Sequence, residues 1–477
     1  MNKQEAISLL DGRQDFLFSV SDSIWDHPET DYQETVSASI LKRALEQEGF
    51  AVQSNLAGIP TAFSGTFGSG SPVIGFLGEF DALPELSQEA GAAEKRPEKE
   101  GANGHGCGHN LLGTGSLAAA IAVKEYLRSN RLPGTVVYFG CPAEEGGSAK
   151  AFMARDGVFD SLDIALSWHP NQFNSVWSFS TLANVRVHYR FKGTSAHAGT
   201  SPHLGRSALD ALELMNMGVQ FLREHIIPEA RIHYAITNTG GEAPNVVQAE
   251  AESVYLIRAP KNEQVREIYE RVNQIAQGAA MMSGVQVEIE LEKACSNILT
   301  NRCLEQILNS NMADIPLPEY TEEEYGFARA IQDTIPGRTL MADRLERTMG
   351  VKGRKLGEEY DKKSIYRFVL PYRPSETAIP GSSDVGDVSW ICPTSQIIAA
   401  TCAGGTPEHT WQMVSQGKSS VAHKGLLYAG KILAAAAIDL IDHPELIQEA
   451  AEEFKSKTGP DGYRPLLPKD AQPNMKA

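Results

Sequence analysis

The glycine-rich run GANGHGCGHN, residues 101 to 110, constrains this chain most strongly. It places Cys107 and His109 two residues apart on a backbone that glycine allows to bend sharply, with His105 beside them. A thiolate and an imidazole are ligand types for zinc and other transition metals. The run supplies only half of a metal site. We therefore expect the fold to add ligands from three later stretches: CPAEEGG (Glu144 and Glu145), LSWHP (His169) and GTPEHTW (His409).

Length and charge limit the class of protein. A chain of 477 residues is too long for one ordinary core, so two or more domains are expected. The net charge of -17 argues against nucleic acid and anionic membrane as partners, because either would require a basic face. The N-terminal sequence lacks the pattern of a signal peptide, and no long apolar run occurs. Six scattered cysteines do not make a disulfide framework, so we expect a cytoplasmic protein.

Four short apolar runs predict buried strands, at residues 72 to 78, 134 to 140, 163 to 168 and 395 to 402. Each run leads into polar residues: Glu79 and Asp81, then the paired glutamates, then His169 and His409. Helical patterns lie between and around them, at about 35 to 49, 111 to 129 and 420 to 441. This alternation indicates an α/β domain with a mostly parallel sheet. Ligands of such sheets bind beyond the carboxyl ends of the strands, where these polar residues fall.

The middle of the chain follows a different pattern. Strand-like alternation and amphipathic helices appear in the order strand, helix, strand, helix, strand, at 185 to 191, 207 to 225, 246 to 259, 262 to 282 and 285 to 291. We expect an α+β domain at residues 184–296, inserted into a catalytic domain made of residues 1–183 and 297–477. Residues 310 to 380 are charged with little periodicity, and we interpret them as an excursion of the larger domain with short helices.

These ligand types support metal-assisted amide hydrolysis. Cys107, His109, His169, His409 and one of the paired glutamates give five protein ligands, which suffice for two divalent ions when bridging groups and water complete the coordination. The other glutamate would act as the general base, and the spacing leaves open which one. Asp81 would orient a ligand histidine. Thiolate and imidazole suit Zn²⁺, and mixed ligand sets also suit Mn²⁺, so both ions stay open.

Structural readings compete with these assignments. A buried cysteine often only packs, paired glutamates often face water, and Asp81 could cap a turn. His169 before Pro170 could end a strand, and His409 taken alone has the weakest sequence context.

Several motifs occur in one order along the chain: GEFDALP, GHGCGHNLLG, CPAEEGG, LSWHP, GTSAHAGTSPHLGRSALDA and GEAPNVVQ. Together they resemble the metallopeptidase family of aminoacylases, carboxypeptidase G and the auxin-conjugate and hippurate amidohydrolases. The resemblance implies a catalytic domain with two metal ions and an inserted lid that also forms a dimer contact. It makes Glu145 the metal ligand and Glu144 the general base, beside Cys107, His109, His169 and His409. Asn110 departs from the aspartate that many members have after the ligand histidine.

The resemblance also assigns roles in the inserted domain. His197 in GTSAHAG would stabilise the oxyanion, in its own chain or in a partner chain. Asn245 and Arg258 are candidates to hold a substrate carboxylate, and Arg206 in HLGRSA is a further one. Each assignment also has a structural alternative: His197 could be a structural histidine near a strand end, Asn245 a turn residue and Arg258 part of a surface ion pair.

The implied activity is hydrolysis of N-acyl or N-aroyl amino acids, with p-aminobenzoyl-glutamate favoured as the small-molecule substrate and p-aminobenzoate and glutamate as products. One alternative is a peptidase or deacylase for another small amide conjugate. A second alternative is a substrate-binding protein that supports a homologous catalytic partner. The expected assembly is a homodimer or a complex with a homologous partner chain.

Overall fold

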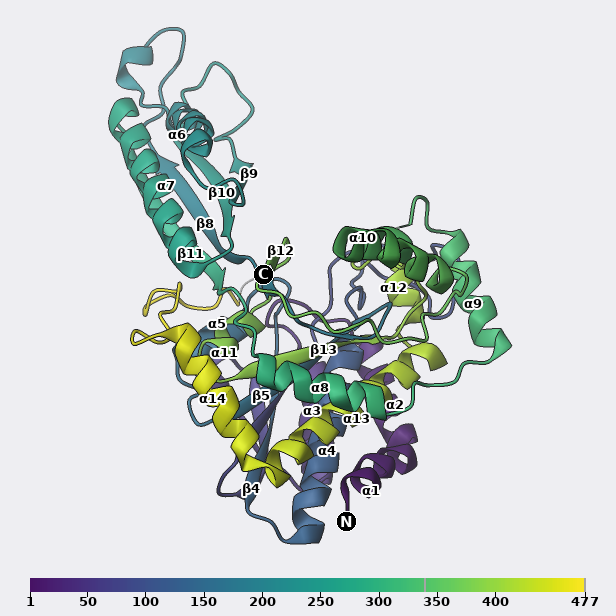
Figure 1. The fold of residues 1–477 in the computed structure, drawn as a ribbon. Coiled ribbons are helices and arrows are strands. Elements are labelled where there is room, and N and C mark those ends of the chain that lie inside the picture. Colours follow the sequence, from purple (N-terminus) through teal and green to yellow (C-terminus); the bar gives the residue numbers. More distant parts are fainter. Residues whose placement is uncertain (339, 476–477) are drawn as a thin grey trace.

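Four parallel strands form the centre of the larger domain, as the apolar runs predict. They are the neighbours β4, β3, β5 and β13 in a seven-stranded sheet of order β1-β2-β4-β3-β5-β13-β6. The computed structural model describes residues 1–338 and 340–475 (Figure 1). The strands span β1 Ala51–Ser54, β2 Phe63–Ser69, β3 Val73–Glu79, β4 Gly134–Cys141, β5 Ile164–Asn171, β6 Ser175–Val176 and β13 Thr394–Ala400.

The outer strands β1, β2 and β6 pair antiparallel, and the sequence did not predict them. β2 has the sequence FSGTFGS, in which two glycines and three hydroxyl residues replace the apolar run of the central strands. The mixed sheet nevertheless confirms the α/β class with a mostly parallel core.

Helices cover both faces of this sheet (Figure 1). The helices α2, α4, α8 and α13 pack with the sheet in one apolar core, while α5 and α11 belong to a second core on its other side. Their bounds are α1 Lys3–Ser8, α2 Gln14–Trp25, α3 Thr35–Gln47, α4 His109–Asn130, α5 Ala149–Arg155, α8 Arg302–Asp314, α11 Val385–Ser389, α12 Trp411–Gln416, α13 Ser420–Asp442 and α14 Pro444–Thr458. The predicted helices correspond to α3, α4 and α13.

Small residues let α4 lie close to the sheet and to α13. The indole of Trp168 in β5 packs against Gly115, where a Cβ atom would lie 2.6 Å from Nε1. The same Nε1 donates to the carbonyl of Leu112 at 3.0 Å. Gly430 of α13 faces the same turn of α4, with its Cβ position 2.9 Å from the Ala118 Cβ. This close packing fixes the start of α4, where His109 lies.

The middle segment forms a separate antiparallel sheet of order β11-β8-β10-β9. Its elements are β8 Ala183–Lys192, α6 Ala208–Leu222, β9 Arg231–Asn238, β10 Glu250–Ala259, α7 Asn262–Ser283 and β11 Gln286–Cys295. The helices α6 and α7 pack together against this sheet, and the whole unit projects from the larger domain (Figure 1). We call residues 184–296 the lid; these bounds stay a prediction. β9 was missed, because most of its side chains are exposed and carry no burial pattern.

The region 310 to 380 contains more helix than its sequence indicated. It includes α9 (Glu322–Asp333), α10 (Met341–Tyr360), which is broken by a kink at Gly350, and the short strand β12 (Ala378–Ile379), which pairs with β7 (Ser180–Thr181). α10 stands across from the lid (Figure 1). Among the helices within residues 1–338 and 340–475, none combines the length and apolar character needed to cross a membrane.

The contact between Gly115 and Trp168 yields a stability prediction. The Gly115→Ala variant should lower the free energy of unfolding by about 1–3 kcal/mol, because the new methyl group overlaps a buried indole. Gly326→Ala is the matched control, since Gly326 lies in α9 with no atom within 4 Å of its Cβ position. That control should raise stability by about 0.5–1 kcal/mol. Urea unfolding measures both, and equal stability of the two variants would contradict the packing argument.

Candidate metal centre

The carboxyl ends of the four parallel strands bring the predicted ligands together. Asp81 follows β3, the paired glutamates follow β4, His169 lies near the end of β5, and His409 lies in the loop after β13. His109 is the first residue of α4, and Cys107 precedes it by two residues. This convergence agrees with the expectation from strand order, while the roles of the individual residues stay predictions.

Two groups of donor atoms share the sulfur of Cys107. In each group the donor atoms lie within 4.8 Å of one another: Cys107 with His109 and His169, and Cys107 with Glu145 and His409. The Cys107 Sγ is 3.4 Å from His169 Nε2, and the His409 Nε2 is 3.4 Å from Glu145 Oε1. The geometry therefore offers two adjacent three-residue sites with a thiolate between them.

Backbone contacts fix the loops that carry these donors. Gly108 precedes α4 with a φ of 79°, a left-handed conformation that glycine adopts without steric cost, and Pro170 lies 3.1 Å from its Cβ position. The His409 N–H donates to the Gly106 carbonyl at 2.9 Å. The glycine-rich run and the distant histidine loop are thereby held side by side.

Asp81 connects the two halves of the centre. One carboxylate oxygen lies 2.8 Å from His109 Nδ1, and the other accepts the Glu145 N–H at 2.9 Å. Because Nδ1 is engaged by the carboxylate, Nε2 is the ring atom of His109 that faces the other ligands. Asp81 thus contacts His109, and its predicted role in orienting a metal ligand stays a prediction.

Buried negative charge dominates the electrostatics. Burial opposes protonation of His109, but the Asp81 carboxylate outweighs it and raises the pKa of this histidine to about 10. Burial also raises the pKa of the Glu144 carboxyl well above its ordinary value, and Glu79 and Glu145 raise it further. The pKa of the Cys107 thiol is raised by burial and then by Glu145. The neighbouring carboxylates therefore favour the cationic form of His109, whereas burial is the largest cause of the shifts at Glu144 and Cys107.

The donor set fits divalent metal ions. His109 Nε2 and Glu145 Oε1 are buried and make no well-formed hydrogen bond. Their nearest charged neighbours are Glu79 at 3.3 Å and His409 at 3.4 Å, and both atoms belong to the groups that share Cys107. Thiolate, imidazole and carboxylate are the ligands that zinc prefers, and imidazole and carboxylate also bind manganese.

A buried ion network behind the centre was missed by sequence reasoning. Lys150 of α5 is fully buried and lies 2.8 Å from Glu79 Oε1 and 2.6 Å from Asp384 Oδ1. The second oxygen of Glu79 lies 3.3 Å from His109 Nε2. Burial lowers the pKa of Lys150, but Asp384 and Glu79 outweigh it and keep the ammonium charged. Glu79, His109 and Glu144 form a third group of donors within 4.8 Å.

A cavity of about 1560 Å³ opens over these donors, between the lid and α10. Although the chain is acidic overall, the cavity lining includes several cationic side chains: Arg186, Arg258 and Lys293 from the lid, and Arg344 and Arg347 from α10. Arg258 is the predicted substrate residue that the structure brings to this cavity, and its Nε is buried without a hydrogen-bond partner.

The other predicted lid residues lie elsewhere in the lid. His197 is exposed, and its Nδ1 accepts the backbone N–H groups of Gly199 and Thr200. Asn245 accepts the Ala198 N–H through its carbonyl, and Arg206 donates to two carbonyls of its own loop. None of His197, Arg206 and Asn245 is among the described residues that line the cavity of this chain.

Two further residues of the glycine-rich motif have structural partners. Asn110 donates to Ser21 Oγ at 3.0 Å and to the Gly417 carbonyl, so it lies behind the centre and holds α4 against α2. His105 is buried with Nε2 3.1 Å from the Ile24 carbonyl, and burial lowers its pKa to about 3.

Comparisons with known proteins find similar sequences and a similar fold. Residues 75–314 match the model of peptidase family M20/M25/M40. The chain is 49% identical over 457 residues to one of the component chains of p-aminobenzoyl-glutamate hydrolase of Escherichia coli K12, covering 95% of both chains. It is 30% identical over 470 residues to the Xaa-Arg dipeptidase of Mus musculus, covering 95% of this chain and 92% of the other. A dinuclear metal binding peptidase of the M20 family from Bacillus subtilis has a similar fold, with a TM-score of 0.56, 16% identity and coverage of 91% and 99%.

The buried network predicts an unusual sensitivity at Lys150. The Lys150→Met variant should lose about 3–5 kcal/mol of unfolding free energy at neutral pH, because Glu79 and Asp384 would stay buried without a counter-charge. Lys431→Met is the control, since Lys431 pairs with Asp11 at the surface at 2.6 Å and should contribute less than about 1 kcal/mol. Chemical denaturation of the metal-free proteins measures both. If the Lys150→Met and Lys431→Met variants have the same free energy of unfolding, the buried network does not stabilise the fold as proposed.

Proposed function

Because the chain belongs to peptidase family M20/M25/M40, we propose that it is a metal-dependent amidohydrolase with p-aminobenzoyl-glutamate as its favoured substrate. The products would be p-aminobenzoate and glutamate. One observation carries the proposal: two donor groups share Cys107 at the floor of a cavity lined with cationic side chains. The donors suit a metal-dependent hydrolase, and the cations suit a substrate that carries carboxylates. The choice of p-aminobenzoyl-glutamate as substrate follows the E. coli relative, which is 49% identical to this chain.

We assign the metal ligands as Cys107, His109, Glu145, His169 and His409. Bound Mn²⁺ or Zn²⁺, two per chain, would lower the pKa of water toward neutrality and polarise the amide carbonyl. Glu145 belongs to a donor group with Cys107, whereas Glu144 belongs to the group with Glu79 and His109; both glutamates line the cavity. This difference supports Glu145 as a ligand and Glu144 as the base.

The chain's own residues would then move the protons and hold the substrate. Glu144 takes a proton from the attacking water and returns it to the nitrogen of the leaving amino acid. Arg258 is positioned in the cavity to bind a carboxylate of the substrate, with charge-assisted hydrogen bonds. Asp81 holds His109 and the Glu145 peptide at fixed relative positions during the reaction.

A dipeptidase is the second candidate, because the mouse relative is named for dipeptides that end in arginine. The cavity lining argues against such a product here: Arg258, Arg186 and Lys293 would repel the guanidinium of a C-terminal arginine. A non-catalytic, substrate-binding role is a third candidate. The proposed metal ligands argue against it because they lie together with a candidate general base.

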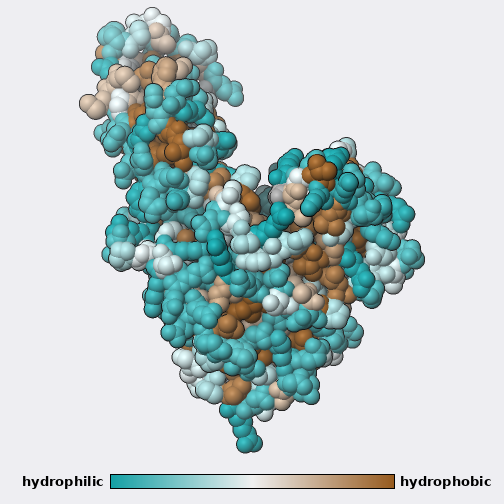
Figure 2. All heavy atoms as spheres, in the orientation of Figure 1, coloured by the Kyte–Doolittle hydropathy of each residue, from teal (hydrophilic) through white to brown (hydrophobic). Residues whose placement is uncertain are grey.

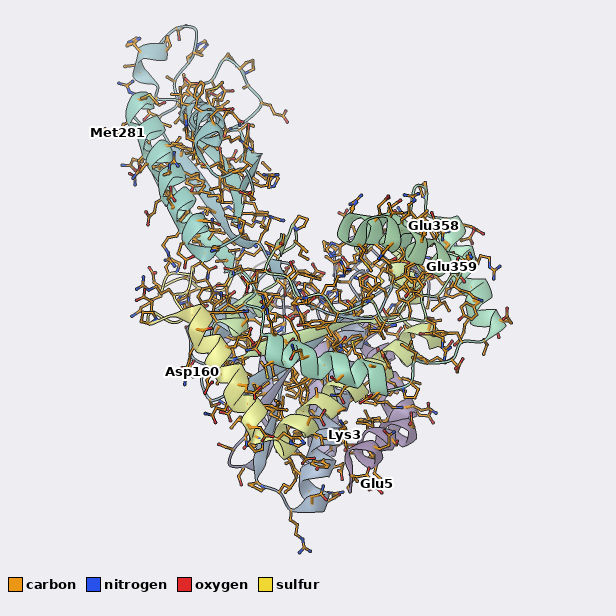
Figure 3. The ribbon with its side chains drawn as sticks, in the orientation of Figure 1. Lys3, Glu5, Asp160, Met281, Glu358 and Glu359 are labelled. Atoms are coloured by element: carbon orange, nitrogen blue, oxygen red, sulfur yellow. The ribbon has the colours of Figure 1, made fainter. Side chains whose placement is uncertain are left out.

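We propose that the lid also joins two chains, as a homodimer or in a complex with a homologous partner chain. β9 is the edge strand of the lid sheet, with Ile236 43% exposed. Apolar side chains gather on the same domain, among them Phe221 at 68% and Met281 at 83% exposure. Figure 2 shows apolar atoms on the lid, and Figure 3 shows Met281 on its outer side, away from the larger domain. Patches of this kind mark protein interfaces.

A second chain would also give His197 a role. Since Nδ1 of the exposed His197 accepts two backbone N–H groups, Nε2 carries the ring proton and can donate it. Such a donor can stabilise an oxyanion in the site of a partner chain. Asn245 and Arg206 lie in the adjoining lid loops and would enter the partner's cavity with it. We place the enzyme in the cytoplasm, which agrees with six free cysteines.

Metal removal and the Glu144→Gln variant test the catalytic proposal. Chelated protein should not hydrolyse p-aminobenzoyl-glutamate, and Zn²⁺ or Mn²⁺ should restore turnover. Glu144→Gln should keep the metal content of the natural protein while kcat falls by about 10²- to 10⁴-fold. Glu145→Gln is the matched variant and should lose metal as well as activity, because it removes a ligand. Near-normal turnover by Glu144→Gln would overturn its assignment as the base.

Mixing two inactive chains tests the role of His197. His197→Ala and Glu144→Gln proteins should each be nearly inactive alone. Unfolding and refolding them together should give mixed dimers in which one site has both native residues. About a quarter of the native activity is then expected, because half of the dimers are mixed and each has one intact site. The absence of any recovery, with dimers verified by light scattering, would show that His197 does not act across the interface.

A further inference from the structure

Aromatic side chains line the cavity beside the metal centre. Trp177 and Phe179 lie two residues apart in the short segment between β6 and β7, and their rings contact each other. The Trp177 ring packs near His169, with ring centroids 6.2 Å apart, and on Phe179 at 4.7 Å. We call Trp177 and Phe179 the aromatic shelf; both line the cavity.

The backbone holds this shelf in place from two directions. The Trp177 N–H donates to the carbonyl of Gln396 in β13 at 2.9 Å. The intervening Ser178 donates from Oγ to the Arg373 carbonyl at 2.7 Å. The shelf is therefore a preformed surface, fixed to the same sheet that carries His169.

The indole N–H of Trp177 is left without a partner. Trp177 is half-buried, and its Nε1 is buried with no hydrogen-bond acceptor. By contrast, Trp25, Trp168 and Trp390 each donate to a backbone carbonyl. Buried tryptophans usually find an acceptor, so an unpaired N–H at the wall of a substrate cavity indicates that a ligand supplies one.

The position of the shelf fits the acyl half of an amide. The scissile carbonyl must lie at the metal ligands, and an aroyl ring is bonded directly to that carbonyl carbon. The ring must therefore lie next to the centre, which is where Trp177 packs near His169. The carboxylates of the amino acid half have separate partners in the cationic side chains of the lid, such as Arg258 and Arg186.

We propose that Trp177 and Phe179 form an acyl-side subsite that selects aromatic acyl groups, with Trp177 Nε1 donating a hydrogen bond to the bound substrate. This inference rests on the proposed amidohydrolase function and specifies its substrate class. Stacking on the indole and the phenyl ring favours a flat aroyl group over a small alkyl acyl group of equal charge.

Binding to an inert enzyme tests the subsite without turnover. In zinc-loaded Glu144→Gln protein, calorimetry would compare the Kd of p-aminobenzoyl-glutamate with that of N-acetyl-glutamate. Adding Trp177→Ala should weaken binding of the aroyl ligand at least about tenfold and that of the acetyl ligand less than about threefold. Trp177→Phe keeps a ring but loses the donor, and should weaken aroyl binding by about 3- to 10-fold. Trp390→Phe is the control, because its indole donates to Asn297 outside the cavity.

The outcomes separate this inference from the proposed function. Loss of the preference for the aroyl ligand in Trp177→Ala, with metal content unchanged, supports the subsite. Equal weakening of both ligands, or no preference before the substitution, overturns it. If the natural protein fails to hydrolyse p-aminobenzoyl-glutamate while the Trp177-dependent preference persists, the proposed substrate is wrong and the aromatic subsite stands.

Discussion

The carboxylate of Asp81 is the contact on which the metal centre depends. It joins the start of α4 to the loop after β4, because one oxygen meets the His109 ring and the other accepts the Glu145 N–H. Neither partner could move independently without leaving a charge buried and unpaired. The proposed ligands His109 and Glu145, which come from two separate elements, are thus held in fixed relative positions by Asp81. Because these side chains are already ordered, metal binding loses less conformational entropy.

The sequence predicted this convergence for a simple physical reason. Parallel strands deliver their carboxyl ends to one edge, so polar residues after four apolar runs must meet there. It could not predict Lys150, because AKAFMAR reads as a short surface helix. Its burial is decided by Asp384, which is 234 positions away in the chain. The strands β2 and β9 were missed for a related reason, since one is rich in glycine and the other is mostly exposed.

The lid shows a different limit of sequence reasoning. The motif around His197 was found by resemblance, but its distance from the cavity is a property of the tertiary structure. The helices around α10 could not be predicted from the sequence. Their charged residues line the cavity, and their apolar residues pack in a small local cluster around Tyr366 and Leu345. Hydrophobic periodicity in a sequence indicates an element that packs on a large core, and this segment packs on a small cluster instead.

The lid and the metal centre are also coupled through backbone. Lys293 of β11 donates to the carbonyl of Glu145 at 2.9 Å, and a register shift between Leu291 and Lys293 re-aims its side chain toward the larger domain. The same strand therefore carries a cation that lines the cavity and a hydrogen bond that holds the ligand loop. If a substrate carboxylate binds Lys293, as the proposed function implies, it contacts a side chain that is also hydrogen-bonded to the Glu145 carbonyl. Binding energy from the amino acid half can in this way orient the groups that act on the amide bond.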